Sequence, residues 1–350
     1  MRWKIAGDDG GQGSLFSEEE LVDRHVGVGE YAGLEFLHVN AKKIINEVPA
    51  VSRVPFRWTI NAYRGCSHSC TYCFARPTHE YLGLDMGEDF DRKIVVKVNA
   101  VERLRAELRR WHHAGEHIAM GTNTDPYQRC EGKYRLTHGI VRVLGEQEHP
   151  FSILTKSTLI LRDLPLLVEA ANRTEVRVNF SIGTLDEATW KSTEPGTPHP
   201  RQRVEAVRKI NAAGIPCGVL VAPIIPGMSD APDQIEQVTR ACVEAGAVSV
   251  SAIPLHLRPG VREHWMEWLR QARPDLVPMY TQRYPKAYLP SAEQETISAV
   301  VRRVLAEARG EWSAPTATRG KSPGAGDRPT KNREKKTAPA DTSFEQGTLL

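Results

Sequence analysis

The stretch Cys66-Ser-His-Ser-Cys70-Thr-Tyr-Cys73 places three cysteines within eight residues, with an aromatic residue just before the last one. Thiolates are soft ligands that suit iron–sulfur clusters or zinc. A cubane [4Fe–4S] cluster normally takes four thiolates, one for each iron, whereas this stretch supplies three. A chelating amino acid, such as the methionine end of S-adenosylmethionine (SAM), could fill the open position on the fourth iron. The spacing therefore favours a reactive cluster over a sealed electron carrier.

A structural zinc site is the alternative for the same three cysteines. Closed zinc sites need four ligands, usually from paired C-x2-C motifs or from C-x2-C with H-x3-H, and the chain has no second cysteine pair. His68 lies inside the same short loop, where four ligands are difficult to arrange around one ion. The local pattern favours the iron–sulfur cluster and leaves zinc as the alternative.

The composition predicts a soluble, cytoplasmic protein without a membrane segment. A chain of 350 residues, 40% of them hydrophobic, can form one large α/β domain or two medium ones. It has no long apolar run, and its Gly- and acid-rich beginning lacks the basic and apolar stretches of a secretory signal. Six cysteines spread over this length do not make a disulfide framework, and a thiolate-bound cluster needs a reducing compartment.

The two ends of the chain differ in composition from its centre. We expect residues 1–34 to be a flexible N-terminal segment and residues 35–312 to form the folded core. Residues 313–350 hold seven Lys/Arg against four Asp/Glu and few apolar side chains, so they are expected to be a disordered basic tail. Because the whole chain carries a net charge of +3, the remaining residues balance to zero.

Short β-branched runs alternate with helical patterns through the centre of the chain, which predicts βαβ units and a parallel sheet. Gly214 and Gly246 follow two of the helical segments as stop signals. The series predicts an α/β fold, a partial (β/α)6 barrel of the TIM type, with its active site at the carboxyl ends of the strands. The expected strands are Arg57–Tyr63, Lys93–Val98, His117–Thr122, Phe151–Lys156, Val176–Ile182, Cys217–Ile224 and Ser249–Ile253, and the expected helices are Ala100–His113, Asp163–Ala171 (with Asp163 as its cap), Arg201–Ala213 and Asp233–Ala245.

Polar and Gly/Pro-rich loops follow the predicted strands at these same ends. They are the cysteine loop, Gly121–Tyr127, Thr155–Ser157, Ser181–Thr184 and Pro223–Gly227. Because the carboxyl ends of the strands of a barrel meet at one rim, the five loops are expected to converge. Their convergence predicts a functional site there.

Cys66, Cys70, Tyr72 and Cys73 resemble the cluster loop of the radical SAM superfamily. The resemblance implies a [4Fe–4S] cluster whose open iron binds SAM, reductive cleavage of SAM to a 5′-deoxyadenosyl radical, and hydrogen abstraction from a substrate. Longer strings between about residues 35 and 300 are similar to the group called DNA repair photolyases, which is related to spore photoproduct lyase. These strings are Thr59–Cys66, Pro77–Gly83, Thr124–Gln128, Thr155–Ser157, Arg162–Asp163, Glu194–Pro195 and Ala222–Pro226.

The same resemblance implies roles for side chains and a partner. Tyr72 would lie against the adenine of SAM, while Thr124 and Lys156 match positions that contact SAM in spore photoproduct lyase. Ser181 matches a third such position. A lysine near the SAM carboxylate is physically sensible, because a compact cation suits an anionic group. An electron donor such as flavodoxin or ferredoxin is implied as the partner.

One position departs from the pattern of spore photoproduct lyase. That enzyme carries a hydrogen-donating cysteine where this chain has Thr122, so efficient spore photoproduct reversal is not expected. Cys130 lies a few residues on and is a candidate replacement, although a lone cysteine in a loop is more often incidental. Asp125, in the same loop, is expected either to orient neighbouring groups or to act on the substrate.

Three functions follow from these patterns. The leading hypothesis is a radical SAM enzyme that acts on nucleic acid or a nucleic-acid-derived substrate. The first alternative keeps the enzyme class but makes the substrate a protein or a small metabolite. The second is a non-catalytic, metal-stabilised binding module tethered to DNA machinery.

Two short strings near the ends of the chain suggest such a tether. Gln12-Gly-Ser-Leu-Phe16 and Gln346-Gly-Thr-Leu-Leu350 resemble the peptides by which bacterial repair proteins bind the DNA sliding clamp. Glycine at the second position departs from the usual aliphatic residue and should weaken binding. Weak clamp binding is therefore expected. The alternative is that these five-residue matches are a coincidence in ends of low sequence complexity.

Overall fold

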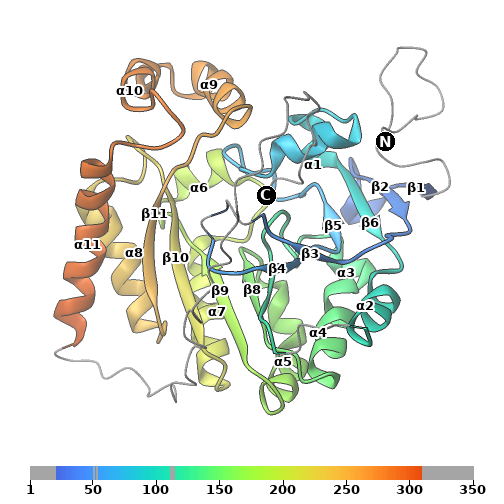
Figure 1. Ribbon diagram of the computed structural model, residues 1–350. Coiled ribbons are helices and arrows are strands. Elements are labelled where there is room, and N and C mark those ends of the chain that lie inside the picture. Colours follow the sequence, from blue (N-terminus) through green and yellow to red (C-terminus); the bar gives the residue numbers. More distant parts are fainter. Residues whose placement is uncertain (1–20, 50–51, 53, 111–114, 310–350) are drawn as a thin grey trace, which may run out of the picture.

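Two β-sheets organise the residues that the structure describes, which are 21–49, 52, 54–110 and 115–309. In this computed structural model the larger sheet runs through the centre of the molecule with helices along its outer side, and the smaller sheet lies beside it (Figure 1). The chain passes from the larger to the smaller sheet between Ile60 and Tyr63, just before the cysteine loop.

The larger sheet has seven strands in the order β11-β10-β9-β8-β7-β4-β3. Every neighbouring pair from β4 to β11 is parallel, while β3 pairs with β4 in the antiparallel direction at the edge. Parallel strands in sequence order with helices between them form an open half-barrel, which confirms the predicted partial (β/α)6 barrel. The strands are β3 (Ile45–Glu47), β4 (Trp58–Ile60), β7 (Ile118–Met120), β8 (Phe151–Thr155), β9 (Val176–Ser181), β10 (Cys217–Ile224) and β11 (Val250–Pro254).

Helices cover the outer side of this sheet. α7 and α8 pack on β10, and α11 packs on α8 and β11. α7 and α8 each begin with a proline and end beside a glycine of positive φ, 83° at Gly214 and 80° at Gly246, as the stop signals predicted. The helices of this layer are α2 (Ala100–Leu108), α4 (Leu136–Glu146), α5 (Leu164–Ala171), α7 (Pro200–Ala212), α8 (Pro232–Glu244) and α11 (Ser291–Arg309).

The smaller sheet, in the order β1-β2-β6-β5, corrects two expectations. Lys93–Val98 is a strand, but it pairs with β2 and β5 and does not join the barrel, because the chain has already left the larger sheet after β4. Residues 21–34 are also not wholly flexible, since β1 pairs with β2 and begins the folded unit before residue 35. The strands are β1 (Leu21–Val26), β2 (Glu35–Val39), β5 (Tyr63–Arg64) and β6 (Lys93–Lys97).

α1, α6, α9 and α10 lie on the side where the parallel strands end (Figure 1). Trp265 of α9 is fully buried, and its ring centroid lies 5.7 Å from that of Tyr280 in α10 and 6.4 Å from that of Tyr72. This aromatic contact joins α9 and α10 to the cysteine loop. The helical elements outside the outer layer are η1 (Gly29–Tyr31), η2 (Arg76–Leu82), α1 (Glu88–Arg92), α3 (Glu131–Tyr134), η3 (Thr158–Asp163), α6 (Glu187–Thr193), α9 (Val261–Ala272), η4 (Pro274–Leu276) and α10 (Val277–Arg283).

Some sequence expectations fall on residues that the structure does not describe. The tail 313–350 and both clamp-like strings, Gln12–Phe16 and Gln346–Leu350, lie outside the described residues. Within the described part, every helix is too short or too polar to cross a bilayer. The cysteines are all free, as expected for a chain without a disulfide framework.

Candidate cluster and SAM site

The cysteine loop begins at Gly65, directly after β5. Gly65 has a φ of 75°, and a Cβ there would lie 2.9 Å from the Phe90 carbonyl oxygen, so the close approach of the two backbones requires glycine. The Cys66 amide donates to the same oxygen at 2.9 Å. Turn hydrogen bonds within the loop then bring the three cysteines together.

Arg76 fixes the loop from one side. Its buried guanidinium donates two hydrogen bonds to the Cys70 carbonyl oxygen, from Nε at 3.1 Å and from Nη2 at 3.0 Å. It also donates from Nη2 to Asp91 Oδ1 at 2.8 Å. Burial raises the pKa of Asp91 to about 6, against the opposing effect of the Arg76 cation. An arginine that uses its donors in this way holds the Cys70 backbone in place.

The three thiols of the cysteine loop have the chemistry of ligands for a soft metal. All three are free, and burial raises the pKa of each, so they stay neutral until a metal displaces their protons. Two sulfur ligands of one zinc ion lie about 3.8 Å apart, given Zn–S distances of about 2.3 Å. Among the described residues, the group of metal-ligating side chains whose atoms all lie within 4.8 Å of one another is Asp23, His25 and His38. The three cysteine sulfurs do not all lie within this distance of one another.

Lys156, Ser181 and Tyr72 meet beside the cysteine loop. Lys156 directly follows β8, and its Nζ donates to Ser181 Oγ, at the end of β9, at 2.5 Å. The same ammonium lies 5.7 Å from the centroid of the Tyr72 ring. Ser181 Oγ in turn donates to the Ala222 carbonyl oxygen of β10 at 2.6 Å. Three neighbouring parallel strands thus present these groups at the same end, because the carboxyl ends of parallel strands share one edge.

Glu194 links these groups, although the sequence analysis gave it no role of its own. Its buried carboxylate accepts a hydrogen bond from the Tyr72 hydroxyl and lies 3.3 Å from Lys156 Nζ and 2.5 Å from Arg203 Nη2. Burial alone would raise the pKa of Glu194, but the Arg203 and Lys156 cations lower it to about 2. Glu194 is therefore ionised and holds the two cations and the tyrosine in one network.

The turn after α6 carries Glu194 into this position. The Gly196 amide donates to the His68 carbonyl oxygen at 3.0 Å. A Cβ on Gly196 would lie 2.2 Å from the Ser67 carbonyl oxygen, so the two backbones can meet only at a glycine. This contact places the Glu194 side chain against the cysteine loop.

Thr124 and Gln128 hold the beginning of the cysteine loop. Thr124 Oγ1 donates to the Gly65 carbonyl oxygen at 2.6 Å, and Gln128 Nε2 donates to the same oxygen at 3.0 Å. Gln128 Oε1 accepts from the Ser67 amide at 2.9 Å. The structure thus brings Thr124 to the cysteine loop, while Lys156, Ser181 and Tyr72 form the group around Glu194.

Asp125 orients its neighbours, the first of the two roles expected for it. Its Oδ1 accepts from Thr155 Oγ1 at 2.7 Å, and its Oδ2 accepts from the Lys156 amide at 2.7 Å. His68 Nδ1 lies 3.4 Å from the same carboxylate, but burial lowers the pKa of His68 and favours the neutral ring. Asp125 therefore fixes the backbone from which the Lys156 side chain extends.

Thr122 stands where spore photoproduct lyase carries its hydrogen-donating cysteine. Thr122 follows β7, and its Oγ1 accepts from Asn61 Nδ2 at 3.2 Å. Cys130, the candidate replacement, is fully buried in the main hydrophobic core, and burial raises its pKa. A thiol enclosed by the core does not replace a thiol at the rim.

The sequence analysis missed several side chains that hold the site together. Arg76 and Arg203 are buried arginines, and Gln128 is a fully buried amide, but in sequence each resembles an ordinary polar residue. Their partners are distant: Tyr72 and Glu194, for example, are 122 residues apart. The glycine two residues after Glu194 was the one local signal of a close backbone approach.

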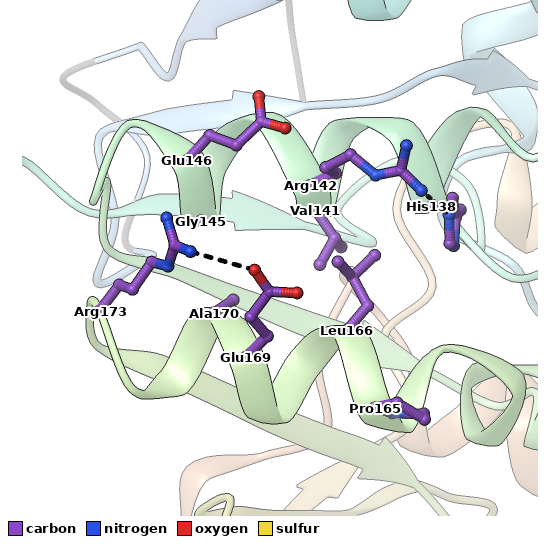
Figure 2. A pocket seen from close by; sticks show the side chains of 10 residues that line it. All are labelled: His138, Val141, Arg142, Gly145, Glu146, Pro165, Leu166, Glu169, Ala170 and Arg173. Atoms are coloured by element: carbon purple, nitrogen blue, oxygen red, sulfur yellow. Dashed lines mark hydrogen bonds and ion pairs between the residues drawn. The ribbon is translucent and has the colours of Figure 1, made fainter.

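A groove between α4 and α5 is not part of this site (Figure 2). It has a volume of about 390 Å³, and charged side chains flank it, including Arg142, Glu169 and Arg173. Arg173 and Glu169 form an ion pair at 3.2 Å across one turn of α5. Both helices belong to the outer layer, whereas the cysteine loop lies beside the strand ends, so the groove is separate from the loop.

Comparisons with known proteins show the family of this chain. A family model described as the radical SAM superfamily matches residues 60–241, a range that contains the cysteine loop and β7 to β10. Uncharacterized proteins of Mycobacterium tuberculosis and Mycobacterium bovis are each 44% identical to this chain over 287 residues, which cover 82% of this chain and 84% of the relative.

Solved structures share the fold. A variant of spore photoproduct lyase matches with a TM-score of 0.57 at 20% identity, over 77% of this chain and 78% of that chain. Spore photoproduct lyase complexed with a dinucleoside spore photoproduct also matches with a TM-score of 0.57, at 18% identity, over 78% and 79% of the two chains. At these identities the likeness establishes a common architecture.

Proposed function

This chain belongs to the radical SAM superfamily, whose enzymes use a [4Fe–4S] cluster and SAM, and we propose that Cys66, Cys70 and Cys73 hold its cluster. The observation that supports this most is the position of the loop. Three free thiols, two of them buried and that of Cys73 partly buried, lie in a loop beside the carboxyl ends of the parallel strands, where (β/α) enzymes carry their active sites. When bound, the cluster and SAM supply one-electron cleavage of SAM to a 5′-deoxyadenosyl radical, which abstracts hydrogen from a substrate.

We further propose that Tyr72, Thr124, Lys156 and Ser181 line the SAM pocket. The Lys156 ammonium suits the SAM carboxylate, and its 3.3 Å separation from Glu194 is long enough for a second anion to compete. The Tyr72 ring, held through its hydroxyl by Glu194, offers a flat apolar surface to the adenine. Ser181 Oγ adds a hydrogen-bonding group beside the ammonium, and Thr124 holds the cluster loop at its first residue.

The proposed substrate is a nucleic acid or a nucleic-acid-derived molecule. The support is the fold shared with spore photoproduct lyase, one structure of which is complexed with a dinucleoside spore photoproduct. Thr122 has no thiol hydrogen to donate, so the reaction should differ from spore photoproduct reversal. Repeated turnover of a spore photoproduct dinucleotide to two thymines would contradict this part of the proposal.

Anaerobic reconstitution with iron and sulfide, followed by SAM and dithionite, tests the assignment. We expect a brown protein with a full [4Fe–4S] complement that forms 5′-deoxyadenosine. Cys70→Ala should lose both the cluster and the product. Cys242→Ala changes a buried cysteine on α8 and is the matched control that should keep both. Full iron content in Cys70→Ala, or a colourless zinc-containing wild type, would reject the assignment.

Two partners complete the proposal. Radical SAM enzymes need an electron donor, and we propose that a flavodoxin or ferredoxin supplies the electron here. The DNA sliding clamp is proposed as a second partner through Gln12–Phe16, Gln346–Leu350 or both, by their resemblance to clamp-binding peptides. These strings lie outside the described residues, so clamp binding stays a prediction for experiment.

A further inference from the structure

Arg64 and Lys97 lie on one face of the smaller sheet, immediately before the cysteine loop. In the antiparallel pair of β5 and β6, Arg64 is opposite Val95, and the Lys97 amide donates to the Ala62 carbonyl oxygen at 3.0 Å. Arg64 and Lys97 are therefore diagonal neighbours on the same face. Long side chains at diagonal positions are within reach of each other, so two cations share a small region.

Within the described part of the chain, the Lys97 ammonium is buried without a carboxylate partner. Lys97 is only 8% exposed, and its Nζ donates to the Asn61 carbonyl oxygen at 2.8 Å. The carboxylate with an electrostatic effect on it, Glu107, instead accepts from the amides of Ile44 and Ile45 at 2.8 and 3.0 Å. Burial and the nearby Arg64 cation lower the pKa of Lys97 to about 7. The positive charge thus has no compensating anion among the described residues.

Arg64 also has no carboxylate partner among the described residues. Its residue is partly buried, and within the described part of the chain its guanidinium makes neither a hydrogen bond nor an ion pair. Arg76, another arginine near the loop, binds Asp91 and a backbone carbonyl of the loop. A guanidinium presents five donors in a planar fork, so Arg64 keeps a binding capacity that Arg76 has used.

The two cations are connected to the rim. Asn61, whose carbonyl oxygen accepts from Lys97, also donates from its side chain to Thr122 Oγ1 at 3.2 Å. Its Oδ1 accepts from the Asn123 amide at 3.2 Å. Thr122 and Asn123 begin the loop that continues into Thr124, one of the proposed SAM contacts.

We propose that Arg64 and Lys97 form a subsite for a phosphate group of the substrate, beside Asn61 and Asn123 at the rim. The inference rests on the proposed function and narrows its substrate to molecules with a phosphate next to the reacting group, as in a phosphodiester-linked nucleotide. A guanidinium fork binds phosphate oxygens in pairs, and a lysine adds a compact charge. Phosphate fits the pair because its oxygens can accept from both cations at once.

A structural role for the pair is the competing interpretation. A structural lysine is expected to gain stability from a carboxylate, whereas an uncompensated buried cation destabilises the folded protein. Proteins keep such costs mainly at functional sites. The two interpretations therefore predict opposite effects of removing the charge: lower thermal stability for a structural lysine, and unchanged or higher thermal stability for a phosphate subsite.

The test compares two labelled thymidine dinucleotides, one with a phosphodiester and one with an uncharged methylphosphonate linkage, for binding to the reconstituted full chain. The wild type should bind the phosphodiester at least about tenfold more tightly, as expected for charge-assisted hydrogen bonds. Lys97→Met and Arg64→Gln should each remove most of this preference, and Lys97→Arg should restore part of it. Lys209→Met changes an exposed lysine of α7 and is the matched control.

Each outcome decides between the interpretations. A wild type that binds both dinucleotides equally, or a preference that survives in both variants, would overturn the subsite. So would a drop in melting temperature in Lys97→Met together with unchanged binding by Arg64→Gln. Competition by inorganic phosphate supports the subsite, and competition by acetate but not by phosphate rejects it in favour of a carboxylate ligand.

The same preparations separate this inference from the proposed function. If the wild type forms 5′-deoxyadenosine from SAM but does not distinguish the dinucleotides, the subsite fails while the proposed chemistry stands. If it forms no 5′-deoxyadenosine yet prefers the phosphodiester, the proposed chemistry fails while the subsite stands. Iron content measured on Arg64→Gln shows whether its loss of binding is due to damage to the neighbouring cysteine loop.

Discussion

Lys156 and Lys97 both stand at strand ends near the cysteine loop, yet their surroundings are opposite. Lys156 lies 3.3 Å from Glu194, which also pairs with the buried Arg203. Lys97 donates to a backbone carbonyl oxygen and has Arg64 as its charged neighbour. In the first region the protein compensates its own cations, whereas in the second the described residues leave two cations without an anion.

The difference separates two ways of preparing a site. A buried carboxylate among cations fixes the position of side chains before any ligand binds, so the geometry is set in advance. An uncompensated cation pair instead carries a cost in stability that a bound anion relieves. Removing one charge should therefore have opposite consequences for folding in the two regions, and this contrast can be tested directly.

The largest effect is expected from Glu194→Gln. The substitution leaves Arg203 and Lys156 without their carboxylate, and breaking a buried ion pair by removing one partner costs about 3–5 kcal/mol. Urea denaturation should show this loss in the free energy of unfolding. Glu187→Gln, which removes an exposed carboxylate of α6 paired with Lys191, is the control that should unfold like the wild type. If Glu194→Gln matches the control, the first region is not the compensated network described above.

Lys97→Met should change stability in the other direction. Replacing the uncompensated ammonium by an apolar chain is expected to raise the free energy of unfolding by about 1–4 kcal/mol, the range for replacing buried ion pairs by well-packed apolar groups. The folded pKa of Lys97, about 7, lies below the ordinary value of 10.5. Between these pH values the unfolded chain binds more protons, so wild-type stability rises with pH through Lys97.

The gain from Lys97→Met should therefore be complete below pH 7 and shrink as the pH rises toward 10.5. Urea denaturation of variant and wild type at pH 6 and pH 9 measures the difference. Because other groups titrate equally in both proteins, subtraction isolates Lys97. A gain that is constant with pH, or a loss at pH 6, would break the contrast with the Glu194 region.

Lys156→Ala should affect ligand binding more than folding. Glu194 keeps Arg203 as a partner in this variant, so the carboxylate stays compensated. Loss of a charge-assisted hydrogen bond to the SAM carboxylate is worth about 1.5–3 kcal/mol, or a tenfold or greater rise in Kd. Equilibrium binding of SAM to the reconstituted protein measures this rise in Kd. Lys191→Ala, which removes an exposed lysine of α6, is the control. Equal SAM affinity in the variant and the wild type would remove Lys156 from the pocket.

Local signals in the sequence were sufficient to predict the strands and helices of the half-barrel. Cys217–Ile224 is a strand with the predicted bounds, because a β-branched run covered on both faces has little alternative. The ends of the helices before Gly214 and Gly246 could also be predicted, because the backbone at these two positions needs a positive φ, which favours glycine. The cysteine loop was found because its ligands are neighbours in the chain.

Features that depend on distant partners could not be predicted in this way. Lys93–Val98 has the composition of a strand, but nothing local says which sheet it joins. Asp163 was expected to cap α5, and it stands at the cap position without a capping hydrogen bond from its side chain. Its carboxylate instead binds Arg162 and His138. The pairing of Glu194 with Arg203 was missed for the same reason: buried charges choose partners by tertiary packing.

The smallest effect concerns the basic tail, a third place where cations outnumber carboxylates, with seven Lys/Arg against four Asp/Glu in residues 313–350. Each clamp-like string places a Gln before an apolar pair, and such peptides bind by placing apolar side chains in a pocket while a polar group fixes the register. Two weak copies can act together on a ring-shaped partner if both reach it, and the tail cations would add salt-sensitive attraction to nearby DNA. Titration of the purified clamp should show weak binding by the full chain, weaker binding by Leu15→Ala/Phe16→Ala, and weaker binding by a chain truncated after Thr342. The truncation removes Gln346–Leu350 and one carboxylate, Glu345, but keeps all seven tail cations, so a loss of binding is due to the string and not to a loss of positive charge. Equal affinity of the three proteins, or no binding at high micromolar clamp, would reject clamp binding by these strings. Of the two groups of excess cations, only the Arg64 and Lys97 pair would then keep a proposed role in binding.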